Sequence, residues 1–310
     1  MKRQFARWIL GICSASLILV SLSDEARAEQ SPAPIRVVTS TTIIADVMRN
    51  VGGEFTDVTS LLPAGANPHS FEPTPADVSR LINASVVFLN GLGLEQSFEP
   101  LIAGAGRQVR VVDLSKNLPA RTLDHGEHDH HDHSTGLDPH VWLDPTLVIA
   151  WIEETVRVLS ELDPRHADHY RANADSYQKE LHELDTWIGE KVAQIPPANR
   201  KIVSDHDMFG YFCERYGFER VGAIIPGFST LSEPSARELA SLEDAIRKLK
   251  VKAVFVGNTV NPTLARRVSE DTHTKLITLY TGSLTDSTGT APDYIAYMRY
   301  NVTAIVNALK

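Results

Sequence analysis

A ten-residue stretch in the middle of the chain, Gly136 to Pro145, presents a histidine from a stiff backbone. Its sequence is GLDPHVWLDP, so His140 lies between two Asp-Pro pairs. Each proline fixes its own φ and pushes the preceding residue away from helical backbone angles. Asp138 or Asp144 is placed to accept the second ring N–H of a histidine, which is how metal-bound imidazoles are usually oriented. The stretch indicates a metal site, although a buried histidine that only completes a turn would leave the same short pattern.

Two more histidines, His69 and His206, occupy comparable places in the sequence. Like His140, each follows a short β-branched run that predicts a strand; these strands are expected at 58–62, 109–114 and 202–204. Ligands bind beyond the C-terminal ends of the strands in open α/β sheets. The three histidines are therefore expected to converge, and three neutral imidazoles suit zinc better than calcium or magnesium.

Predicted strands alternate with predicted helices on both sides of one long amphipathic segment. The other strands are expected at 35–39, 86–89, 220–224, 253–256 and 276–279. This alternation predicts βαβ units and parallel sheets. Residues 165–195 carry an apolar residue every three or four positions, which predicts a helix about 46 Å long. The predicted fold class is α/β, with two lobes, each a roughly four-stranded parallel sheet flanked by helices, joined by one long helix.

The predicted domain boundaries follow from this pattern and from the first residues of the chain. Residues 1–28 have a basic start, an apolar run and the small-residue sequence Ala26-Arg27-Ala28, which together predict a cleavable signal peptide. Cys13 lies inside the apolar run and is expected to be removed with it. We then expect an N-terminal lobe at 29–163, a connecting helix at 164–196 and a C-terminal lobe at 197–310.

A tract of acids and histidines at 124–133 interrupts the first lobe. It holds five of the twelve histidines and no apolar residue, so it is expected to form a loop that does not pack. Such a density of histidines and carboxylates binds Zn²⁺ or Cu²⁺ weakly whatever else the loop does. We expect it to be distinct from a high-affinity site, because it lacks a framework that fixes ligand geometry.

The net charge and the cysteine content argue against nucleic-acid binding and against a disulfide within the mature chain. Cleavage after residue 28 removes four basic and two acidic residues, which takes the formal net charge from −9 to −11. An acidic protein is a poor partner for nucleic acid and attracts cations. Only Cys213 would remain, so no disulfide within the chain is expected. With the predicted signal peptide, these features suit a soluble exported protein, which we expect to be a monomer.

Three motifs resemble the metal-site motifs of the zinc/manganese solute-binding proteins of ABC importers. They are NPHSFEP at 67–73, DPHVWLDP at 138–145 and HDMFGYF at 206–212, and YMRYN at 297–301 resembles that family's C-terminal ending. The resemblance spans the whole mature chain and implies that His69, His140 and His206 are metal ligands. It also implies that a membrane permease is the partner, and the acidic, histidine-rich insert resembles that of zinc-uptake members.

The chain departs from that family pattern at one position. Many members carry an aspartate ligand after the last strand of the second lobe, where this sequence has Gly282. Water or Asp286, in the same loop, is left to complete the site. Without a carboxylate ligand the site should discriminate against Mn²⁺, and Gly282→Asp is expected to tighten binding and favour manganese.

The sequence thus predicts a non-enzymatic periplasmic protein that captures zinc and delivers it to an ABC-type importer. One alternative is a manganese- or iron-binding member of the same family. Another is a zinc-dependent hydrolase, since three histidines and a water also form catalytic sites. Against the hydrolase, none of the motifs is a helical HExxH pair with a built-in general base. A third alternative is a surface adhesin or metal buffer with no transporter. The sequence does not exclude it, because a surface that docks on a transporter has no recognisable motif.

Overall fold

The computed structural model describes residues 33–105, 109–122 and 136–310. The predicted signal peptide and the tract at 124–133 lie outside these described residues. Within the described part of the chain, none of the helices has the length and apolar character needed to cross a membrane.

The first lobe is built on a four-stranded parallel sheet with strand order β2-β1-β3-β4. Its elements are β1 (Ile35–Thr39), α1 (Thr42–Gly52), β2 (Thr56–Ser60), α2 (Pro75–Ile82), β3 (Val86–Leu89), α3 (Glu99–Ala105) and β4 (Arg110–Asp113). The strands are short and β-branched, as buried parallel strands usually are. Parallel pairing brings the C-terminal ends of all four strands to one edge of the sheet.

The second lobe repeats this topology, with strand order β6-β5-β7-β8. Its elements are β5 (Lys201–His206), α6 (Gly210–Tyr216), β6 (Glu219–Ile225), α7 (Ala236–Leu249), β7 (Ala253–Gly257), α8 (Thr263–Thr272) and β8 (Lys275–Leu279). The predicted fold class, two lobes with four parallel strands each, is confirmed.

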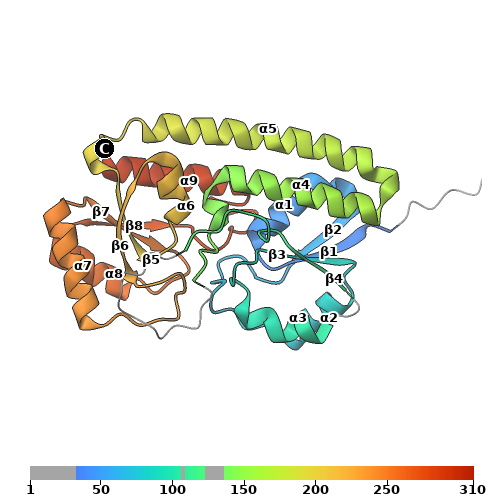
Figure 1. Ribbon diagram of the computed structural model, residues 1–310, viewed down its shortest axis with the longest axis horizontal. Helices are drawn as coiled ribbons and strands as arrows, with labels where there is room; N and C mark the ends of the chain where they lie inside the picture. Colours follow the sequence, from blue (N-terminus) through green and yellow to red (C-terminus); the bar gives the residue numbers. More distant parts are fainter. Residues whose placement is uncertain (1–32, 106–108, 123–135) are drawn as a thin grey trace, which may run out of the picture. The chain divides into compact units, whose positions relative to one another are not determined.

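Helix α5 (Ala167–Val192) connects the lobes, and it is flanked by α4 (Pro145–Leu162) and α9 (Tyr294–Leu309). Helix α5 lies along both α4 and α9 (Figure 1), and it also contacts α1. Its buried side chains form the stripe expected from the sequence: Tyr170, Ala174, Tyr177, Leu181, Leu184, Ile188 and Val192. One continuous apolar core includes residues of both sheets and all three of these helices. The long helix therefore ties the lobes together through burial of its apolar face.

Several boundaries differ from those expected. His206 is the last residue of β5 and does not follow a shorter strand, so its backbone is held by the sheet. Helix α5 begins at Ala167, because residues 164–166 form a 3₁₀ turn. Helix α7 begins at Ala236, after the N-cap Ser235, whose hydroxyl and the Glu238 carboxylate form a capping box. Pro234 lies directly before this cap.

Candidate metal centre

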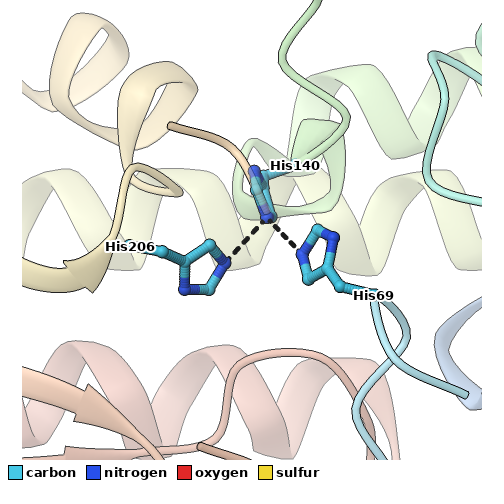
Figure 2. A group of neighbouring side chains, drawn as sticks. All are labelled: His69, His140 and His206. Carbon is cyan, nitrogen blue, oxygen red and sulfur yellow. Dashed lines mark hydrogen bonds between the residues drawn. The ribbon is translucent and has the colours of Figure 1, made fainter. Parts of the chain in front are cut away.

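The three predicted histidines meet between the lobes (Figure 2). His140 Nε2 lies 3.2 Å from His69 Nε2 and 3.1 Å from His206 Nε2. All three ligand atoms lie within 4.8 Å of one another, and among the described residues no other histidine, cysteine or acid joins this group. At a Zn–N distance of about 2.0–2.1 Å, tetrahedral ligands are separated by about 3.3 Å. The measured separations are close to that value.

His140 is fixed by its neighbours in the loop between β4 and α4. Asp138 Oδ1 accepts hydrogen bonds from the His140 ring Nδ1–H at 2.8 Å and from its backbone N–H at 3.0 Å. Asn90, directly after β3, donates from its side-chain amide to the Pro139 carbonyl at 3.0 Å. The Trp142 ring packs edge-on against the imidazole. His140 and Asp138 are both fully buried, so the ring is oriented before any ion arrives.

His206 is oriented by the residue that precedes it. Asp205 Oδ1 accepts from the His206 Nδ1–H at 2.7 Å, and Asp205 Oδ2 accepts from the Gly257 N–H at the end of β7 at 2.6 Å. Both residues are in β5 and buried. This carboxylate connects the His206 imidazole to the neighbouring strand β7. The orientation of the ring is therefore fixed by the sheet of the second lobe.

His69 belongs to the loop that follows β2, and its ring is less enclosed than those of the other two. Asn67 Oδ1 accepts from the His69 backbone N–H at 3.0 Å. Pro68 is buried beside it, whereas Glu72 is exposed to solvent. Glu72, the acid nearest to His69 in the motif, is therefore not enclosed in the site.

Burial determines the protonation of the site. It lowers the pKa of both His69 and His140 well below the usual value, and the neighbouring imidazoles lower both further. Both rings are therefore neutral at neutral pH, which is the form that binds a metal. Burial also raises the pKa of Asp138 to about 7. The pKa of Asp205 lies below its usual value because the His206 ring and the Gly257 N–H outweigh its burial.

The contact between His140 and His206 suits a cation between the rings. When Nδ1 of each ring donates its hydrogen to the adjacent ionised aspartate, Nε2 of the neutral imidazole carries a lone pair. These two lone pairs face each other at 3.1 Å, which is unfavourable without a proton or a cation between them. Since burial disfavours the protonated form of His140, a metal cation satisfies this arrangement best.

Gly282 lines a small cavity beside the three rings. The cavity beside the rings has a volume of about 10 Å³ and is also lined by Thr259 and Thr281. That is close to the space needed by one water molecule. Asp286 is exposed, and its Oδ1 accepts hydrogen bonds from the backbone and hydroxyl of Thr288, so it does not reach the group of three histidines.

The sequence missed some of the residues that support the site. Asp138 orients a ligand as expected, but Asp144 does not: its carboxylate accepts from the Thr146 N–H and caps α4. Asp205 was not selected from the sequence, although its place directly before His206 was the available signal. Thr259 and Thr281 have no sequence signal, because only the fold brings their loops to the cavity.

Comparisons with known proteins agree with this arrangement. Residues 37–308 match the family described as "Zinc-uptake complex component A periplasmic". The "Manganese-binding lipoprotein MntA" of Halalkalibacterium halodurans is 36% identical over 276 residues, which is 89% of this chain and 88% of the relative. The "Iron-binding protein YfeA" of Yersinia pestis is 29% identical and covers 92% of this chain and 90% of its own.

Solved structures show the same fold. The "periplasmic zinc binding protein TroA from Treponema pallidum" has a TM-score of 0.80 and 27% identity, and the match covers 90% of this chain and 99% of that one. A mutant of the Mn-bound periplasmic metal binding protein from Candidatus Liberibacter asiaticus has a TM-score of 0.79 and 26% identity, with 89% and 100% covered.

Proposed function

Because the chain belongs to the zinc-uptake component A family, the metal-binding proteins of ABC importers, we propose that its cargo is zinc, held by His69, His140 and His206. The observation that carries the proposal is the pair of Nε2 atoms of His140 and His206, 3.1 Å apart, with both Nδ1 atoms bound to carboxylates. A dication between the rings accepts both lone pairs. Members of this family are binding proteins, so the hydrolase alternative has no support.

The choice of zinc over manganese rests on the donor atoms. Three imidazole nitrogens and a water suit zinc, whereas manganese prefers more carboxylate and other hard oxygen ligands. The names of the relatives do not favour zinc: several are named for manganese and one for iron, while a structural neighbour is named for zinc. Manganese or iron capture is therefore the alternative within the same family.

A competitive titration tests the cargo. Protein purified without added ions or chelator is first analysed for metal, then stripped and titrated with Zn²⁺ and Mn²⁺ against a chelating dye. We expect one tight zinc ion per chain and binding of Mn²⁺ that is weaker by orders of magnitude. Equal affinity for the two ions would favour manganese as cargo and require a carboxylate ligand that the geometry lacks.

The cellular setting is part of the proposal. Residues 1–28 would direct export and be removed, leaving lobes at 29–163 and 197–310 joined by the helical segment 164–196. The mature protein would act as a monomer in the periplasm and deliver zinc to the importer's permease. The N-terminus of the mature protein, read by mass spectrometry, should be Glu29; retention of residues 1–28 would contradict export by cleavage.

We assign the tract at 124–133 a secondary role, which is to collect additional zinc weakly near the site. Calorimetry of a variant lacking these ten residues should show loss of weak sites and retention of the tight one. Loss of the tight site in this variant would contradict the assignment.

A further inference from the structure

The loop that carries His69, residues 63–71, contacts the second lobe through three residues that precede that histidine. The three contacts are Gly65 N–H to Ser283 Oγ at 2.8 Å, Asn67 Nδ2 to Thr230 Oγ1 at 2.9 Å, and Pro68 packed against Gly282. The rings of His140 and His206 are oriented by Asp138 and Asp205 of their own lobes, and the Asp138 carbonyl also accepts from the Tyr211 hydroxyl of the second lobe. The position of the His69 loop therefore depends in part on contact between the lobes.

Asn67 links the ligand to the other lobe through a single side chain. Its Oδ1 accepts from the His69 backbone N–H at 3.0 Å, while its Nδ2 donates to Thr230 Oγ1. Thr230 lies in the loop after β6. Any movement that draws the His69 loop away from the second lobe must break this bond or pull Asn67 away from His69.

Gly282 provides the surface on which the same loop rests. A Cβ at this position would lie 2.4 Å from Pro68 Cδ and 2.9 Å from Pro68 Cγ, closer than atoms of a rigid ring tolerate. Pro68 is buried there. At the position where many family members carry an acidic ligand, Gly282 therefore leaves the space in which Pro68 packs. This also revises the expectation for Gly282→Asp, since its side chain would displace Pro68 before its carboxylate reached an ion.

We propose that the Asn67–Thr230 hydrogen bond and the Pro68–Gly282 contact form a latch that sets the rate of metal release. The inference rests on the proposed function and names the residues that control that step. Both contacts exist only while the His69 loop is docked, so they oppose opening and have little effect on the encounter with an ion. Neither Asn67 nor Thr230 is a ligand; both are positioning residues.

The test compares Thr230→Val, which keeps the side-chain shape but removes the hydroxyl, with Thr230→Ser, which keeps the hydroxyl. Zinc release into excess chelator is followed by stopped flow, and the association rate is measured separately. Loss of one hydrogen bond predicts release roughly 2- to 10-fold faster for Thr230→Val. We expect an unchanged association rate, and a release rate for Thr230→Ser near that of wild type.

A double-mutant cycle with Asn67→Ala isolates the pair. The effect of Thr230→Val should largely disappear when Asn67 is already absent, and Gly282→Ala should accelerate release by displacing Pro68. Equal release from wild type, Thr230→Val and Gly282→Ala would overturn the latch while leaving zinc capture intact. A wild-type protein that takes up no zinc would instead contradict the proposed function, and the latch with it.

Discussion

At the residue scale, the sequence was most informative about the three histidines. His140 between two Asp-Pro pairs and His69 after Asn-Pro have locally stiff backbones, so their motifs could be recognised without a fold. The partners of these residues are less predictable. Gly257, Thr230 and Gly282 have ordinary sequence surroundings and become relevant only because the lobes bring their loops together.

Substitutions of Asp205 and Asp144 test whether a carboxylate close to a ligand histidine in sequence contributes to zinc affinity. Both Asp205 oxygens accept hydrogen bonds, so Asp205→Asn places an N–H₂ against either the His206 ring N–H or the Gly257 N–H. Such losses typically cost about 10- to 100-fold in metal affinity. We expect that decrease in a zinc titration.

Asp144→Asn is the control for this prediction, because the Asp144 carboxylate caps α4 and does not contact a ligand histidine. It should lower stability by about 1 kcal/mol or less, while zinc affinity remains close to that of wild type. Equal zinc affinity in Asp205→Asn and Asp144→Asn would show that the orientation of His206 does not require Asp205.

At the element scale, periodicity predicted most of the fold. The strands β1 and β3 have the bounds expected from their β-branched runs, and the stripe along α5 is the predicted one. The ends of helices and strands were less predictable, because the hydrogen bonds that set an end are not visible in the pattern of apolar residues. A 3₁₀ turn at 164–166 delays the start of α5 to Ala167, and ladder hydrogen bonds extend β5 to His206.

The junction of α1 with α5 and α9 contains a buried acid whose effect depends on pH. Asp46 accepts from the Tyr177 hydroxyl and from the Tyr294 backbone N–H, each at 3.1 Å. Burial raises the pKa of Asp46 to about 6 from 3.8. The folded state therefore holds this proton more tightly than the unfolded state. Its contribution to stability is present below about pH 4 and is lost as the pH rises through 6.

Asp46→Asn removes this titration while retaining an oxygen that accepts from Tyr177. Relative to wild type, the variant's free energy of unfolding should improve by on the order of 2 kcal/mol between pH 4 and pH 7. Urea unfolding at both pH values measures the difference. Asp57→Asn, at an exposed position of β2, is the control. A difference that is constant with pH would mean that the pKa of Asp46 is the same in the folded and the unfolded protein.

At the scale of the whole molecule, two lobes of the same topology contribute histidines to one cluster. The first lobe supplies His69 and His140 and the second supplies His206. No local pattern in the sequence fixes the distance between the lobes, since α5 and the shared core set it. The sequence therefore predicted convergence, but not the small cavity or the loop contacts that enclose it.

Because zinc would bind to residues of both lobes, zinc binding should increase the free energy of unfolding of the whole protein. Free zinc at a thousand times its dissociation constant should raise the free energy of unfolding by roughly 4 kcal/mol. Urea unfolding with zinc and with a chelator measures this increase. In His206→Ala, which removes the ligand of the second lobe, most of the increase should be lost. An undiminished increase in that variant would mean that zinc stabilises the protein from another site.

The most direct test of the account is anomalous X-ray diffraction, at the zinc absorption edge, from crystals of zinc-loaded mature protein. We predict one strong peak between the lobes, about 2.0–2.1 Å from the Nε2 atoms of His69, His140 and His206, with water as the fourth ligand. A peak elsewhere, or one ligated by a protein carboxylate in place of one of these imidazoles, would contradict the three-histidine site.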